Sequence, residues 1–160
     1  LAGVLGRRPA ARCLCSPARR AVETASLCGL RTEPEADLRE IDFGQCEGKT
    51  FPQISAESPG FVATWAAFRE DFAFPGGEGL RDFLGRVHGV ADRLAADPAD
   101  TILAVTHGGV IRTMICRLLG LSPRQYLLFR VDPASVTTLE LHDGKGVLAG
   151  LNDLSHLGGI

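Results

Sequence analysis

The stretch Thr101–Gly120, TILAVTHGGVIRTMICRLLG, decides the fold of this chain of 160 residues. Its first six residues form a largely apolar run, as expected of a strand that is buried on both faces in a parallel sheet. Apolar residues over Val110–Leu119 predict a helix that stops at Gly120. Because only His107-Gly108-Gly109 separates the strand from the helix, this order indicates an α/β fold.

The order of strand, turn and helix occurs once more, near the start of the chain. Ala11–Cys15 predicts a short strand, and Ser16-Pro17 predicts a helix N-terminus with Ser16 as the N-cap. This helix is expected to end before Gly29, with an apolar face made of Ala21, Val22, Ala25 and Leu27. Two such units favour a three-layer α/β fold, in which helices flank a mostly parallel sheet.

Three further segments complete the predicted domain, which spans residues 1–160. Glu78–Ala96 has the apolar spacing of a helix. Val136–Leu141 and Val147–Leu151, with turn residues at Asp143-Gly144, predict a closing hairpin. Residues 49–77 are the least regular part and are expected to form a lid-like insert. Their aromatic stripe, expected on one side of a helical piece, fits core packing or a substrate lid: Phe61, Trp65, Phe68 and Phe72.

The composition narrows the class of protein. With 45% apolar residues, 22% charged residues and a formal charge of −2, the chain resembles one soluble globular domain, and the scattered arginines argue against a nucleic-acid partner. No apolar run approaches the roughly 18 residues of a membrane span, so we expect a cytoplasmic protein. The five cysteines are odd in number and include no CxxC pair, which predicts reduced thiols without a disulfide or a zinc site.

Charged residues gather where the two predicted helices begin. Arg19 and Arg20 lie in the opening turn of the first helix, and His107 precedes the second. A cation at a helix N-terminus costs up to about 1 kcal/mol unless an anion shares the site, so this placement favours an oxyanion such as phosphate. Glu40, in the loop after the first helix, can protonate a leaving alcohol. From the residues alone, other roles remain possible. The arginines can be simply solvated, His107 can be a helix cap or a nucleophile, and Glu40 can be an ordinary surface acid.

Five motifs in this order resemble those of the histidine phosphatase superfamily, also called phosphoglycerate-mutase-like. The segment from Ser16 to Ala25, SPARRAVETA, is similar to the family pattern SPxxRAxxTA. The others are Leu38-Arg39-Glu40 with Phe43-Gly44 and Glu47-Gly48, then Pro75-Gly76-Gly77-Glu78, Thr106-His107-Gly108-Gly109-Val110-Ile111-Arg112, and Asn152. The resemblance implies that Arg20, His107 and Gly108 bind a phosphoryl group and that Glu40 is the proton donor. It implies a small phosphorylated metabolite as substrate, with no cofactor and no metal.

The same resemblance implies a nucleophilic histidine in an Arg-His-Gly motif at the end of a first strand. None of the four histidines is in that context: His88, His107, His142 and His156. We therefore expect that this sequence, which begins at Leu1, omits the first strand. In that case His107 is the companion of the nucleophile rather than the nucleophile itself. The implied mechanism is phosphoryl transfer to the upstream histidine, followed by hydrolysis of the phosphohistidine.

Several classes stay open within and outside the family. Gly108 stands where the acid-phosphatase branch has an aspartate, and the short separation of Glu40 and His107 disfavours the mutases. Phe129–Asp132 with Leu151-Asn152 is similar to the α-ribazole phosphatases of cobalamin assembly. A mutase, a broad-specificity phosphatase and an inactive phospho-ligand binder are the alternatives. Cys13 and Arg19 match the C-x5-R signature of cysteine phosphatases, but chance matches are frequent and Pro17 removes a backbone donor there.

Overall fold

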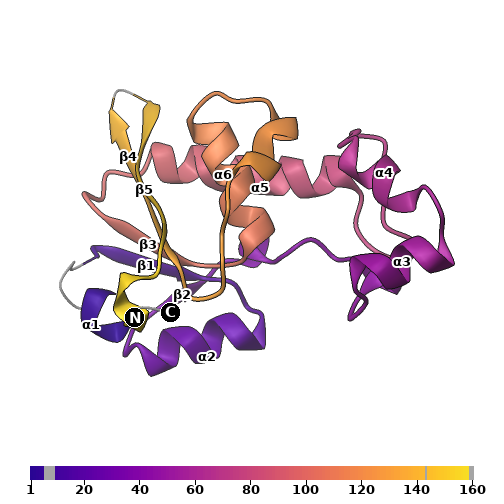
Figure 1. Ribbon diagram of the computed structural model, residues 1–160. Coiled ribbons are helices and arrows are strands. Elements are labelled where there is room, and N and C mark those ends of the chain that lie inside the picture. The colour runs from indigo at the N-terminus through magenta and orange to yellow at the C-terminus, as the bar shows by residue number, and fades with distance from the viewer. Residues whose placement is uncertain (6–9, 143, 159–160) are drawn as a thin grey trace. The chain divides into compact units, whose positions relative to one another are not determined.

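The computed structural model describes residues 1–5, 10–142 and 144–158 (Figure 1). The chain forms two compact units, which we treat separately. The larger unit contains Leu1–Glu40 and Val87–Ile160, and the smaller unit contains Ile41–Arg86. That the whole chain acts as one domain with residues 49–77 as a lid stays a prediction.

A parallel sheet of three strands forms the centre of the larger unit. The strand order is β2-β1-β3, with β1 at Arg12–Cys15, β2 at Glu33–Pro34 and β3 at Ile102–Val105. This confirms both predicted strands and the parallel sheet. The predicted burial of both faces is wrong for β3, whose residues are all only partly buried. Among the described residues β3 pairs with β1.

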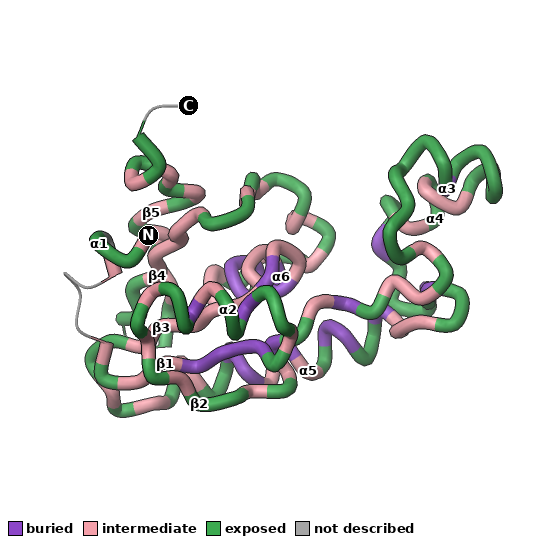
Figure 2. The backbone as a smooth tube through the Cα atoms, turned by 90° about the horizontal axis from the view of Figure 1, so that it is seen from below, coloured by how far each residue is buried: buried purple, intermediate pink, exposed green. Residues whose placement is uncertain are grey.

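Helices cover both sides of this sheet. Figure 1 shows α2 (Arg19–Leu27) on one side and α6 (Gly108–Leu118) on the other, as a three-layer fold requires. The helix α5 (Leu80–Ala95) begins in the smaller unit and contributes its second half to the larger one. Figure 2 shows buried stretches along β1, α5 and α6, and a buried cluster joins β1 to α2.

The helix α2 differs from its prediction in two ways. Its N-cap position is Ala18 rather than Ser16, because Ala18 still has the extended backbone angles of a residue before a helix, φ −63° and ψ 133°. Ala21 and Ala25 pack with Cys15 in the core, but the other two residues of the predicted apolar face do not. Val22 is 48% exposed and Leu27 is 86% exposed. The small alanine side chains alone form the face that meets the sheet.

The remaining elements of the larger unit are short, apart from one hairpin. The strands β4 (Val136–His142) and β5 (Lys145–Asp153) pair antiparallel, which confirms the hairpin, although residue 143 of its turn lies outside the described residues. The single-turn helices are α1 (Ala2–Leu5), η1 (Ala36–Leu38) and η4 (Ser155–Leu157), and η3 (Pro123–Leu128) is slightly longer. In the described part of the chain, no helix has the length and apolar character that crossing a membrane requires.

The smaller unit is held together by aromatic side chains. It contains η2 (Gly44–Cys46), α3 (Phe51–Glu57), α4 (Phe61–Ala66) and the start of α5. The single helical piece expected there is interrupted, because Phe68 has a φ of 49° and ends the helical run after α4. Ring centroids 5.0–6.0 Å apart link Phe43, Phe61, Trp65, Phe72 and Phe74. The aromatic stripe therefore serves as packing within this unit.

Candidate functional site

The register of the sheet brings two strand ends to the same level. Cys15 is the partner of Val105, and the backbone N–H of Ser16 donates to the Val105 carbonyl at 2.9 Å. The residues that follow β1 therefore lie beside those that follow β3. This is the edge of a parallel sheet at which helix N-termini and ligands meet.

His107 occupies this position and is 93% buried, with only 7% of its surface exposed. Its Nε2 lies 2.8 Å from Ser16 Oγ, and its Nδ1 accepts a hydrogen bond from Arg20 Nε at 3.2 Å. An arginine Nε–H can only donate, so Nδ1 carries the lone pair and the neutral ring has its proton on Nε2. The structure therefore brings Arg20 and His107 together, although 87 positions separate them in the sequence.

Arg19 behaves differently from its neighbour. Its guanidinium is 91% exposed and pairs with Glu23, one turn along α2, at 2.6 Å. The interpretation as a solvated arginine therefore holds for Arg19, whereas Arg20 reaches the strand ends. Adjacent arginines with different surroundings give a matched pair for experiments.

Glu40 reaches the same turn from another direction. Its Oε2 accepts a hydrogen bond from the backbone N–H of Gly109 at 3.0 Å, at the start of α6. Two residues earlier, the Leu38 carbonyl accepts a hydrogen bond from Thr106 Oγ1 at 2.7 Å. The loop that carries Glu40 is thus attached to both sides of His107. The first backbone N–H groups of a helix have no acceptor within the helix, so they favour a carboxylate in this position.

Residues that the sequence did not reveal surround this site. Burial raises the pKa of Tyr126, while the charge of the Arg112 guanidinium opposes this shift and the charge of the Glu40 carboxylate adds to it. Arg112 donates to the Phe129 carbonyl at 2.8 Å and to the Val131 carbonyl at 3.3 Å. The contacts of Ser16 and Gly109 were also missed, since Ser16 was predicted to cap a helix and Gly109 to lie in the turn before Val110. Only the contacts between distant segments of the chain show that these two residues belong to the site.

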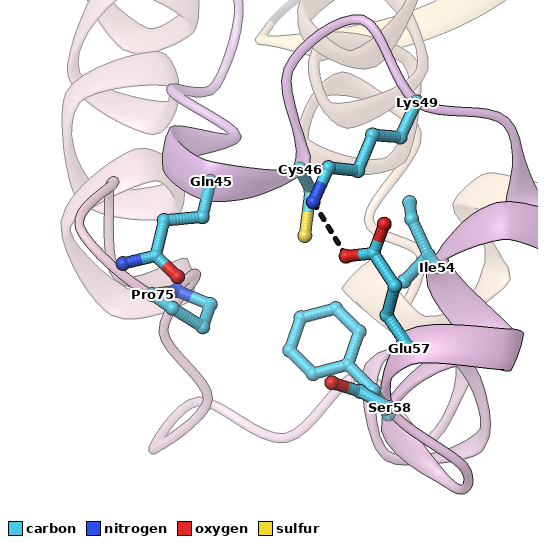
Figure 3. Close-up of a pocket in the computed structure, with 8 residues that line it drawn as sticks. Gln45, Cys46, Lys49, Ile54, Glu57, Ser58 and Pro75 are labelled. Atoms are coloured by element: carbon cyan, nitrogen blue, oxygen red, sulfur yellow. Dashed lines mark hydrogen bonds and ion pairs between the residues drawn. The ribbon is translucent and has the colours of Figure 1, made fainter.

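A second polar feature lies entirely within the smaller unit. Gln45, Cys46, Lys49 and Glu57 help to line a pocket in which the Lys49 ammonium and the Glu57 carboxylate point toward each other, 2.6 Å apart (Figure 3). None of the predicted site residues lines this pocket. In the part of the chain that the structure describes, no three His, Cys, Asp or Glu side chains gather as metal ligands would.

The sequence and the fold of this chain both match one known class of protein. The chain is a member of the histidine phosphatase superfamily, branch 1, whose family model matches residues 1–154. The family resemblance is therefore confirmed.

Individual relatives differ in the substrates that they are named for. Phosphoserine phosphatase 1 of Hydrogenobacter thermophilus is 28% identical over 139 residues, which cover 86% of this chain and 66% of that protein. The α-ribazole phosphatase structure from Shigella flexneri has a TM-score of 0.81 at 28% identity, covering 95% of this chain and 78% of that one. A mycobacterial glucosyl-3-phosphoglycerate phosphatase, solved with inorganic phosphate, has a TM-score of 0.78 at 28% identity, covering 95% and 81%.

Proposed function

We propose that this chain is the phosphate-binding and proton-donating part of a phosphomonoester hydrolase that works through a phosphohistidine. The convergence of Arg20 and His107 on one point at the strand ends supports this proposal. A guanidinium and an imidazole N–H held together in this way suit the oxygens of a transferring phosphoryl group. The backbone of Gly108, which opens α6, is the third proposed phosphate contact.

The hydrogen bonds of His107 favour its role as a companion rather than as the nucleophile. A nucleophilic nitrogen needs a free lone pair, but the lone pair on Nδ1 already accepts from Arg20. The proton on Nε2 makes that side of the ring a donor, so a bound phosphoryl oxygen would replace Ser16 Oγ as its acceptor. The proposed nucleophile is therefore the histidine of an Arg-His-Gly motif outside residues 1–160, as in the family.

In the proposed reaction this histidine attacks phosphorus in line. The bond between phosphorus and the leaving oxygen breaks with its electron pair on that oxygen, which takes a proton from Glu40. Water then attacks the phosphohistidine and gives its proton to the Glu40 carboxylate, and the nitrogen–phosphorus bond breaks with its electron pair on the histidine, which releases inorganic phosphate. Positioning and fixed positive groups do most of the catalytic work in such a reaction.

The proposed substrate is a small phosphorylated metabolite, and α-ribazole 5′-phosphate is the specific candidate. The similarity to an α-ribazole phosphatase structure supports it, as does the segment around Asn152. Asn152 Nδ2 donates to Asp132 Oδ2 at 2.8 Å, and the Asp132 N–H donates back to Asn152 Oδ1 at 2.7 Å. This reciprocal pair fixes the segment 129–132, in which the resemblance to the α-ribazole phosphatases lies.

Trapping the intermediate tests the proposal. The protein as its gene encodes it is mixed with a radiolabelled phosphomonoester and denatured in base, which preserves phosphohistidine, and the label is mapped by proteolysis. We expect the label on a histidine of an Arg-His-Gly motif outside residues 1–160. Label on His107 would overturn its role as companion, and the absence of label during turnover would overturn the covalent mechanism.

A further inference from the structure

Gly109 has no conformational reason to be glycine. It is the second residue of α6, and it is not among the glycines with a positive φ, so its backbone conformation suits any L-residue. Some other requirement must therefore account for a glycine at this position.

The Glu40 carboxyl group supplies that requirement. A Cβ atom added to Gly109 would overlap Glu40 Oε1 and would lie 3.1 Å from the carboxyl carbon and 3.3 Å from Oε2. The carboxyl group thus lies directly over the Gly109 Cα, while its Oε2 accepts the Gly109 N–H at 3.0 Å. The lack of a side chain at Gly109 leaves room for the Glu40 carboxyl group, and the Gly109 N–H binds that same group.

We propose that Gly109 is the positioning residue for the proton donor Glu40, an inference that rests on the proposed function. In a protonated carboxyl group the carbonyl oxygen is the better acceptor and the other oxygen carries the proton. The Gly109 N–H on Oε2 therefore assigns the proton to Oε1. When the leaving oxygen takes that proton, the charge left on the carboxylate is held by the same N–H and by the N-terminus of α6.

The neighbouring contact restricts the loop backbone, whereas the Gly109 contact acts on the orientation of the Glu40 carboxyl group. The hydrogen bond between Thr106 Oγ1 and the Leu38 carbonyl fixes the backbone two residues before Glu40. It cannot fix the rotation of the carboxyl group, which is three bonds from the Glu40 backbone. The Gly109 N–H acts directly on this rotation through its hydrogen bond to Oε2, and general-acid catalysis depends on such alignment.

The test compares leaving groups in the protein as its gene encodes it. Gly109→Ala should lower kcat for an alkyl phosphate, whose alcohol needs a proton, by about 10²-fold, and should change kcat for nitrophenyl phosphate by less than about threefold. Glu40→Gln should show the same selectivity, and the double variant should be no slower than Glu40→Gln alone. Gly89→Ala is the control, because its Cβ would meet only the end of Arg93, at 3.6 Å.

The outcomes separate the two proposals. If Glu40→Gln slows both substrates equally, the proton-donor role fails. If Glu40→Gln is selective but Gly109→Ala slows both substrates equally, or adds its full loss to that of Glu40→Gln, only the positioning role of Gly109 fails.

A measurement on the unmodified residue 109 keeps the inference testable if Gly109→Ala does not fold. The Gly109 amide proton should exchange slowly with solvent because Glu40 Oε2 accepts it, and this protection should be lost in Glu40→Ala. A Gly109 amide that exchanges equally fast in both proteins would overturn the hydrogen bond on which the inference depends.

Discussion

The two turns that leave the sheet, at residues 16–20 and 106–109, look alike in the sequence and use their atoms differently. After β1, the site is made by side chains: Ser16 Oγ and the Arg20 guanidinium both contact His107. After β3, the backbone also takes part, because the Gly109 N–H holds Glu40. One turn thus presents a cation and the other holds a carboxyl group. A strand-turn-helix pattern therefore predicts where a site lies, but not which atoms form it.

Replacing Arg20, in the first turn, should cause the largest loss of activity. We expect Arg20→Ala to lower kcat/KM by about 10²–10³-fold and to weaken inhibition by inorganic phosphate, because it removes a charged donor from the transferring group. Arg19→Ala is the matched control, since Arg19 is exposed and pairs with Glu23 on its own helix. Steady-state kinetics on both variants decide the matter. Equal losses in the two would show that Arg20 acts through general charge or helix stability instead.

Replacing Ser16 should have a smaller effect, which is measured as a loss of stability. Its hydroxyl is fully buried, and it accepts from the Ala18 N–H at 3.3 Å besides contacting His107. Ser16→Ala leaves a buried imidazole N–H without this partner, which typically costs about 1–3 kcal/mol. We expect that loss in the free energy of unfolding from denaturant titration, with partial recovery in Ser16→Thr. The exposed Ser26 on α2 is the control, and an equal loss in Ser26→Ala would assign the effect to the helix.

Much of the fold was predictable, because the decisive signals are local. Apolar runs and glycine stops defined β3 and α6, and the hairpin followed from its turn. The start of α2 was predicted wrongly because serine before proline is a typical N-cap, whereas the contact with His107, 91 positions away, assigns Ser16 to the site. Such long-range contacts leave no periodic pattern. The role of Gly109 could not be predicted for the same reason, since only the position of Glu40 shows why residue 109 has no side chain.

Alkylation of thiols should have the smallest effect, and it sharpens the comparison by testing whether a cysteine takes part in the first turn. Burial raises the pKa of Cys15, partly opposed by a hydrogen bond with Thr32, and burial also raises the pKa of Cys116. A raised pKa lowers the thiolate fraction at neutral pH, so both should react slowly with iodoacetamide, and faster as the pH rises.

Cys13, the one cysteine with the C-x5-R spacing, lies within β1 and is paired in register with Leu103, two residues short of the strand end. A nucleophile of a cysteine phosphatase needs a loop of backbone donors around it, which a strand residue followed by Pro17 lacks. We therefore expect that labelling the accessible thiols, followed by mass spectrometry, leaves hydrolysis unchanged. Inactivation that follows modification of Cys13 and is prevented by inorganic phosphate would instead make the first turn the source of the nucleophile.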